Sequence, residues 1–408
     1  MREPDATQDT PDVRQDTIDR LRLARAEGVG PVTFRRLLTR FDSPAAALRA
    51  LPGLARAGGR AAPPTVPGEA DVIAELDATA KLGGRILLFG AADYPPLLAL
   101  LDDAPPAIAV LGDIALLSLR AVALVGGRNA SVNGRRIAED LGAELARAGL
   151  VVVSGMARGI DAAAHHGALS IGPPLGRTVA VVAGGLDIPY PPDHADLQRR
   201  IAAAGAVVTE ASPGTVPQAR HFPRRNRIIA GLSLGVVVVE AALRSGSLIT
   251  ARLAIEAGRE VFAVPGSPLD PRSCGGNDLI RQGATLVESA ADVLANLPEL
   301  PAAGVAAGGA PEGVPLFPRQ AAPDAAAGFA ETLPTDLDMM DSVRNRADLH
   351  AQVLELLGPS PTPVDAVVRR CQFSAPAVMA ALLELELAGR VETLPGGRVA
   401  ALLNPAGQ

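Results

Sequence analysis

The sequence predicts an α/β protein in which a doubly wound, Rossmann-like parallel sheet is preceded by a small helical domain and followed by a winged-helix domain. Three observations support this prediction. Between about residues 70 and 297, apolar runs rich in β-branched residues alternate with amphipathic stretches, which is typical of a parallel sheet covered by helices on both faces. Short helical patterns fill residues 14–58. Three more helical patterns between residues 347 and 389 precede a hairpin pattern at 391–402, as in a winged helix.

Six apolar runs are candidates for buried strands. They lie at 121–127, 150–155, 178–185, 206–210, 235–240 and 260–266. The helical patterns between them lie near 132–148, 158–170, 193–203, 225–233 and 247–258. Because right-handed crossovers join consecutive parallel strands, this order builds a doubly wound sheet. Ligands of such sheets bind outside the carboxyl ends of the strands, so the residues just after each strand are the candidates for function.

Changes in composition predict the domain boundaries. We expect a disordered tail at 1–13, a helical domain at 14–70, the Rossmann-like domain at 71–297, a flexible Ala/Gly/Pro linker at 298–342 and a winged-helix domain at 343–408. In the helical domain, a Gly-x-Gly turn at 28–30 opens an amphipathic helix, and a second turn is expected at 51–54. The pattern resembles a helix-hairpin-helix module, whose turn amides can contact phosphates, or a SAM-like packing domain, which is the interpretation that we favour.

The composition excludes several classes of protein. Cys274 and Cys371 are the only cysteines, too few for a disulfide framework or a cysteine-based zinc site. The N-terminus is polar and acidic, unlike a secretory signal, and no apolar run reaches the roughly 18 residues needed to cross a bilayer. We therefore expect a cytoplasmic protein without membrane contact. Aromatic residues make up only 2% of the chain, which disfavours a wide stacking platform for single strands.

The net charge of −6 is unusual for a protein that binds nucleic acid, but the charge is unevenly distributed. Residues 121–290 contain 17 Arg and 14 acidic residues, a local net charge of +3. Four of these arginines lie within eight positions: Arg220, Arg224, Arg225 and Arg227. Because no acidic residue lies between Glu210 and Glu240, we expect the four arginines to lack a local counter-ion and to attract phosphate.

The first two strand ends combine glycines with polar residues. Gly126, Gly127 and Arg128 follow the first predicted strand, and Ser154 and Gly155 end the second. Glycines let backbone amides approach an anion, the following helix N-terminus adds partial positive charge, and an arginine adds a bidentate phosphate donor. A dinucleotide site would need G-x-G-x-x-G and an acidic end to the second strand, and a P-loop would need a Lys-Ser/Thr pair. Since neither pattern is present, we expect no cofactor.

Two later helix starts complete the predicted anion-binding surface. The first carries one aromatic residue beside an Asn and three Arg: Phe222, Arg224, Arg225, Asn226 and Arg227. Phe222 fits a base-stacking role and a role as an anchor in the core equally well. The second helix start is formed by Ser245, Gly246 and Thr250, which offer hydroxyl groups and backbone amides to an anion.

No residue is predicted to be catalytic or to bind a metal. The acidic residues near strand ends are Asp161, Asp187, Glu210 and Glu240. They belong to different strands, and none pairs with a nucleophile, so nothing demands a hydrolytic role. His165 and His166 lack acidic or cysteine partners at ligand spacing, and we favour a structural role for both.

Several motifs follow one another in a fixed order over residues 92–285. They are YPPLL from Tyr94, VGGRNAS at 125–131, SGMARGIDAAAH at 154–165, FPRRNRIIAGLS at 222–233, VVEAALRSGSLITARLA at 238–254 and REVFAVPG at 259–266. Together they resemble the DNA-processing protein A family, also called DprA or Smf, and ordered motifs of this length are highly specific. Gly127 departs from the usual Ser of the family, and His194 stands where an Asn is common. Neither change removes a charge.

The resemblance implies a non-catalytic protein that binds single-stranded DNA entering the cell in natural transformation, protects it, and loads the RecA recombinase onto it. It also implies a homodimer formed through the Rossmann-like domain. The arginine of the family's Val-Gly-Ser-Arg motif corresponds to Arg128, and the basic Phe-Pro-x-Arg-Asn-Arg motif corresponds to Phe222 through Arg227. No motif identifies the residues of the dimer or RecA surfaces.

We therefore expect a phosphate groove along the carboxyl edge of the sheet, with little base preference. Two alternatives stay open. A nucleotide hydrolase of the phosphoribohydrolase type would share the glycine-rich strand ends and a late carboxylate such as Glu240. A regulator that reads duplex DNA through its winged helix should be basic there. Residues 346–408 instead hold five Arg and six acidic residues, which fits a protein-contact or auxiliary role better.

Overall fold

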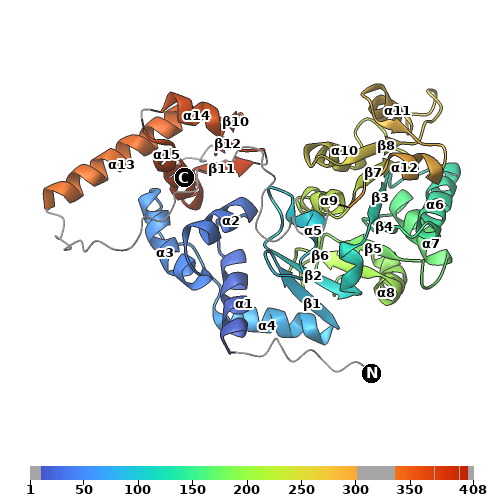
Figure 1. Ribbon diagram of the computed structural model, residues 1–408, viewed down its shortest axis with the longest axis horizontal. Helices are drawn as coiled ribbons and strands as arrows, with labels where there is room; N and C mark the ends of the chain where they lie inside the picture. The colour runs from blue at the N-terminus through green and yellow to red at the C-terminus, as the bar shows by residue number, and fades with distance from the viewer. Residues whose placement is uncertain (1–10, 301–335, 372, 395, 403–408) are drawn as a thin grey trace. The chain divides into compact units, whose positions relative to one another are not determined.

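The structure, a computed structural model, describes residues 11–300, 336–371, 373–394 and 396–402. It divides into two units (Figure 1). The sheet unit is Gly68–Ala302, and the helical unit combines Met1–Pro67 with Ala303–Gln408. Most of the predicted tail and linker lies outside the described residues. None of the described helices has the length and hydrophobicity required to cross a membrane.

Nine strands form the central sheet, in the order β1-β2-β6-β5-β4-β3-β7-β8-β9. Their bounds are β1 Gly84–Leu88, β2 Ala107–Gly112, β3 Ala121–Val125, β4 Val151–Ser154, β5 Thr178–Val181, β6 Ala206–Thr209, β7 Gly235–Val238, β8 Glu260–Ala263 and β9 Thr285–Leu286. Strands β3 to β9 run parallel to one another. The strand order reverses between β3 and β7, which confirms the doubly wound fold and marks the usual ligand position of such sheets.

The six predicted strands are β3 to β8. Almost every residue in them is buried, which explains why their apolar runs are continuous rather than alternating. Two further strands, β1 and β2, are not among the predicted strands, and they extend the sheet antiparallel beside β6. No long amphipathic helix joins them, so they lack the strand–helix alternation on which the prediction rests.

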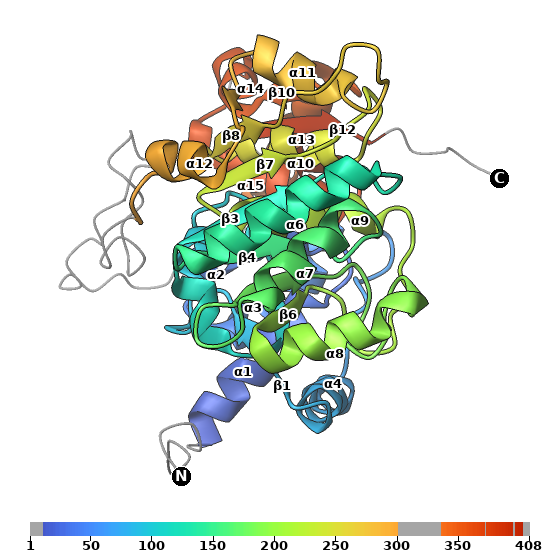
Figure 2. The same ribbon diagram turned by 90° about the vertical axis from the view of Figure 1, so that its right-hand side faces the viewer.

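Helices cover both faces of the sheet. They are α4 Glu69–Lys81, α5 Pro96–Ala99, α6 Val132–Arg147, α7 Ile160–Ser170, α8 Ala195–Ala204, α9 His221–Gly231, α10 Ser247–Glu256, α11 Cys274–Arg281 and α12 Ala290–Asn296. Figure 2 shows α6, α7 and α8 lying across one face of the sheet, where Leu141 and Leu145 belong to the buried core. Helices α9 and α10 cover the opposite face with Ile228, Ile229 and Ala251.

Helix α9 begins earlier than the sequence suggests. The helical pattern is predicted from residue 225, but the helix starts at His221. Its first two turns therefore contain the whole arginine motif, and the 3.6-residue period turns these side chains to different faces. This periodicity separates arginines that are neighbours in the sequence into exposed and buried positions.

The N-terminal part of the helical unit consists of α1 Pro11–Ala24, α2 Pro31–Arg40 and α3 Pro44–Ala57. The Gly-x-Gly turn at 28–30 precedes α2 as predicted, with Gly30 at its N-cap. The second turn expected at 51–54 is wrong, because these residues lie inside α3 despite Pro52. Ala47, Leu51 and Leu54 are buried at helical spacing, and this packing holds the helix through a residue that cannot donate a backbone hydrogen bond.

The C-terminal part of the helical unit is a winged helix. Its elements are α13 Asp336–Leu356, β10 Thr362–Pro363, α14 Val364–Arg370, α15 Ala375–Leu387, β11 Val391–Leu394 and β12 Arg398–Ala401. The strands form a small antiparallel sheet in the order β10-β12-β11. The three helices and the hairpin predicted from the sequence are thus present, which confirms the fold class of this part.

Candidate nucleic-acid interface

Four side chains meet above the carboxyl ends of the strands and form what we call the aromatic–arginine cluster: Arg128, Tyr190, Phe222 and Arg225. The guanidinium carbon of Arg128 lies 4.8 Å from the ring centroid of Phe222, and that of Arg225 lies 5.9 Å from it. The Tyr190 ring packs against Phe222 with centroids 5.7 Å apart. These distances suit cation–π contacts. The loop after β3, the loop after β5 and the start of α9 each contribute to the cluster.

Exposure differs across the cluster. Arg128 is exposed, Tyr190 is 44% exposed, and Phe222 is partly buried. Among the described residues, no carboxylate forms an ion pair with Arg128 or with the exposed Arg224 nearby on α9. A guanidinium that is held over a ring, without a bound carboxylate, keeps its N–H donors for an external anion.

Arg225 lies beneath the surface of the cluster and is only 6% exposed. A side chain at Gly155 would overlap its guanidinium, so the glycine is needed for this close approach. Asp161 on α7 lies 3.9 Å away, too far for a hydrogen bond, and the Nε of Arg225 has no hydrogen-bond partner in the described structure. Burial raises the pKa of Asp161, an effect that the positive charge of Arg225 opposes.

Arg227 is fully engaged inside the protein. Its Nη2 donates to both oxygens of Glu210, at 2.7 and 2.6 Å, and its Nη1 donates to the carbonyl oxygen of Asp103. The expectation that the arginines of α9 lack counter-ions is therefore wrong for Arg225 and Arg227. The partner of Arg227 comes from the end of β6, and that of Arg225 comes from α7.

The helix N-terminus after β3 is occupied by a carboxylate of the protein itself. Glu240, which follows β7, accepts hydrogen bonds from the backbone nitrogen and the hydroxyl of Ser131 at 2.8 and 2.5 Å. A side chain at Gly134 would overlap this carboxylate. The amide of Gly127 also donates to the carbonyl oxygen of Glu240, at 2.6 Å. The positive end of α6, at which we expected a phosphate, thus binds Glu240 across the strand-order reversal.

Several of the other predicted site residues support the framework. Ser154 is fully buried and donates to the carbonyl oxygen of Leu124 at 2.6 Å. Thr250 is buried, and the amide of Asn226 donates to the carbonyl oxygen of Gly246 at 3.3 Å. A side chain at Gly126 would collide with Ile160, so this glycine serves packing between β3 and α7.

Two predicted residues, Ser245 and Gly246, lie near the surface in the loop between β7 and α10. Gly246 is exposed, and Ser245 is partly buried with its hydroxyl 2.7 Å from that of Ser247. Tyr190 is the residue of the cluster that the sequence analysis does not select. Its signal is that it is one of only two Tyr in the chain and follows a predicted strand. His165 is buried, bonds to the Thr178 hydroxyl at 2.8 Å, and fits the structural role that we favour.

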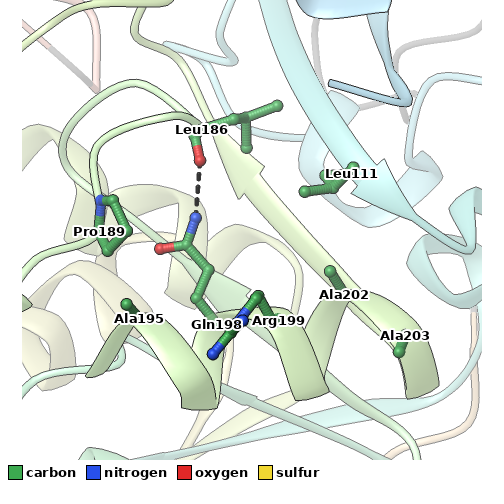
Figure 3. Close-up of a pocket in the computed structure, with 8 residues that line it drawn as sticks. All are labelled: Leu111, Leu186, Pro189, Ala195, Gln198, Arg199, Ala202 and Ala203. Atoms are coloured by element: carbon green, nitrogen blue, oxygen red, sulfur yellow. Dashed lines mark hydrogen bonds between the residues drawn. The ribbon is translucent and has the colours of Figure 1, made fainter. Parts of the chain in front are cut away.

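A separate pocket of about 430 Å³ lies between β2 and α8 (Figure 3). Its lining is mostly apolar and contains none of the predicted site residues. Gln198 lies in its wall and donates to the carbonyl oxygen of Leu186 at 2.7 Å. No carboxylate lines this pocket, so it does not present the acid or base that a nucleotide hydrolase would need.

Three family models match successive parts of the chain. The description of the first is DNA recombination-mediator protein A, and it covers residues 85–298. A DprA-like N-terminal HHH domain matches residues 14–78, and a DprA winged helix domain matches residues 338–397. The chain belongs to the DprA/Smf family. The family resemblance and the helix-hairpin-helix alternative for the N-terminal domain are thereby confirmed.

Two bacterial relatives and one solved structure of the family align with this chain over most of their own length. Protein Smf of Escherichia coli strain K12 is 42% identical over 307 residues, which is 75% of this chain and 74% of that protein. The DNA processing protein DprA of Bacillus subtilis is 43% identical over 225 residues, 55% of this chain and 75% of that protein. The X-ray structure of DNA processing protein A from Streptococcus pneumoniae matches with a TM-score of 0.58 and 35% identity, covering 70% of this chain and 98% of that one.

Proposed function

We propose that this protein binds single-stranded DNA at the aromatic–arginine cluster, without strong preference for sequence. The observation that carries the proposal is Arg128, which lies exposed over the ring of Phe222 and has no carboxylate partner in the described structure. A guanidinium can bind the phosphate, and an exposed aromatic ring such as Tyr190 can stack on an unpaired base. Duplex DNA keeps its bases stacked inside, so this combination favours single strands.

In this proposal the exposed residues contact the DNA and the buried residues support them. Arg128 and Arg224 bind phosphates directly, and Ser245 and Gly246 add polar contacts. Arg225 supports the ring of Phe222 from beneath the surface. Arg227, Asn226, Ser154, Thr250, Gly126, Gly127 and Gly155 hold the surface in shape.

The local charge around α9 supports anion binding there. The pKa of His221 is lowered, first by partial burial and then by the positive charges of Arg220 and Arg224. His221 is therefore neutral at pH 7, and the positive charge of this edge comes from arginine. With two to three phosphates neutralised, the logarithm of affinity should fall with the logarithm of salt with a slope of about −2.

Further roles extend this proposal. On the family resemblance, we propose that the bound strand is protected in natural transformation, that RecA is loaded onto it, and that the protein is a cytoplasmic homodimer. We also propose that the protein is not an enzyme. Two acidic residues near the strand ends, Glu240 and Asp161, already interact with the N-terminus of α6 and with Arg225.

An Arg128→Ala variant tests the site. Arg128 makes no ion pair in the described structure, so the variant should fold normally and bind oligo-dT about tenfold more weakly, the loss of one charge-assisted contact. The matched control is Arg199→Ala, since the Arg199 side chain is 78% exposed on α8 and its single ion pair within the described part of the chain is with the exposed Asp196. Fluorescence anisotropy measures both affinities. Equal affinities for the two variants would refute the proposed site.

A further inference from the structure

Helix α15 of the winged helix is buried on two faces. One face belongs to the hydrophobic core of the winged helix and includes Val378, Leu382 and Leu385. Leu383 and Leu387 are also buried, at 3% and 0% exposure, but they are not part of that core. A second layer of protein must therefore cover this other face.

The N-terminal helices provide that layer within the helical unit (Figure 1). Gly58, at the end of α3, lies so close to α15 that a side chain there would overlap the carbonyl oxygen of Glu384 and come within 2.9 Å of the Ala388 methyl carbon. The backbone of Gly58 is right-handed helical, with φ −70° and ψ −4°, a conformation open to any residue. The glycine is thus required by the contact and not by its own backbone.

A polar contact adds to this packing. Arg36 of α2 lies 3.7 Å from a carboxylate oxygen of Glu386 on α15 and 3.4 Å from the hydroxyl of Thr393 on β11. Both charged side chains are largely buried, and burial lowers the pKa of Arg36, an effect that the charge of Glu386 opposes. One N-terminal arginine therefore contacts the helix and the wing together, which defines their orientation.

The charge of α15 argues against a role in reading DNA. In helix-turn-helix proteins the corresponding helix enters the major groove and needs polar or basic side chains. Apart from two Glu, every residue of α15 is apolar, and the helix contains no Lys or Arg. Glu384 is buried and bonded to His350 at 2.9 Å.

We infer that the outer face of α15 is a protein-docking surface whose occupant is the N-terminal helical domain of the same chain. The winged helix closes onto α2 and α3, and this contact covers the helix that a duplex reader would insert into DNA. The inference is independent of the proposed DNA site, because every residue that carries it lies in the helical unit.

Hydroxyl-radical footprinting of the full chain tests the inference. In the wild type, Leu383 and Leu387 should be oxidised as slowly as the core residue Leu382 and at least tenfold more slowly than Leu269, which is 92% exposed. Leu383 and Leu387 reacting as fast as Leu269 would overturn the inference without any variant.

A pair of glycine variants separates docking from folding. Gly58→Ala should raise the oxidation of Leu383 and Leu387 several-fold and leave Leu382 and Leu385 protected. Gly53→Ala is the matched control on α3, because a side chain there meets no atom within 4 Å, and it should change nothing. Equal oxidation of Leu383 and Leu387 in both variants would overturn the inference.

Discussion

The carboxyl edge of the sheet and the winged helix both carry features that are associated with DNA, but they present them differently. At the sheet edge, Arg128 and Arg224 are exposed and unpaired in the described structure. In the winged helix, α15 is apolar and acidic, and its outer face is covered by α3. DNA binding therefore has to be judged from exposed, unpaired donors, since the family of a domain does not show which of its surfaces is free.

The same distinction holds inside one helix. Arg224 and Arg227 are three residues apart on α9, yet one is exposed and the other is bonded to Glu210 and Asp103. Their substitutions should therefore have opposite consequences for stability and for DNA affinity.

The largest expected effect is on the stability of an Arg227→Met variant. Removing the Arg227 guanidinium from this largely buried ion pair breaks its hydrogen bonds to Glu210 and Asp103 and should lower the free energy of unfolding by about 3 kcal/mol. The oligo-dT affinity of the remaining folded protein should be unchanged. Urea unfolding and anisotropy measure the two quantities. A stable Arg227→Met protein with weakened DNA binding would reverse our assignment of this residue.

The dependence of the unfolding free energy on pH tests whether His165 is buried and neutral inside the sheet unit. Burial, first of all, lowers the pKa of His165 from 6.5 to about 3. Between pH 6.5 and pH 3, His165 is protonated in the unfolded chain but neutral in the folded protein. The free energy of unfolding therefore falls as the pH drops below 6.5, by about 2 kcal/mol at pH 5. A His165→Gln variant should lack this part of the pH dependence. Identical slopes of unfolding free energy against pH in both proteins would contradict the buried, neutral state of His165.

Two glycines at the sheet edge provide a smaller test. A Gly155→Ala variant should displace the Arg225 guanidinium and cost about 1–2 kcal/mol, because the overlapping atoms are the end of a side chain with little room to move. Gly246→Ala adds a methyl group that meets no atom within 4 Å and should be neutral within about 0.5 kcal/mol. Thermal unfolding measures the stability of both variants. Equal unfolding midpoints would show that Gly155 is not needed for the position of Arg225.

The smallest effect concerns salt dependence. Arg224→Ala should leave stability within about 0.5 kcal/mol of the wild type and make the salt slope of oligo-dT binding shallower by about 0.7, the loss of one phosphate contact. Anisotropy titrations at several salt concentrations measure this slope. An unchanged salt slope would show that Arg224 does not contact a phosphate, and Arg128 would then be the one exposed arginine assigned to the interface.

Much of the fold could be predicted because it depends on periodicity. The buried strands β3 to β8 read as continuous apolar runs, and the helices between them follow a 3.6-residue period. Helix α3 could not be predicted in full, since Pro52 and Gly53 are strong local turn signals that the packing of Leu51 and Leu54 overrides.

The candidate site could be predicted only in part. The motifs name Arg128 and Phe222 as site residues, but neither the contact between these two side chains nor the ion pairs of the site could be predicted. Asp161 lies 64 positions before Arg225 in the chain, and Glu240 lies 109 positions after Ser131. Only the strand order brings these groups together, so local charge counting left Arg225 and Arg227 without partners.

Ultraviolet cross-linking of the full chain to oligo-dT, followed by peptide mapping, shows where the single strand binds. We expect cross-links in the peptides that contain Tyr190 and Phe222, and their loss when excess unlabelled single strand is added. Cross-links confined to α15 and the wing, residues 375–402, would contradict the proposed DNA site.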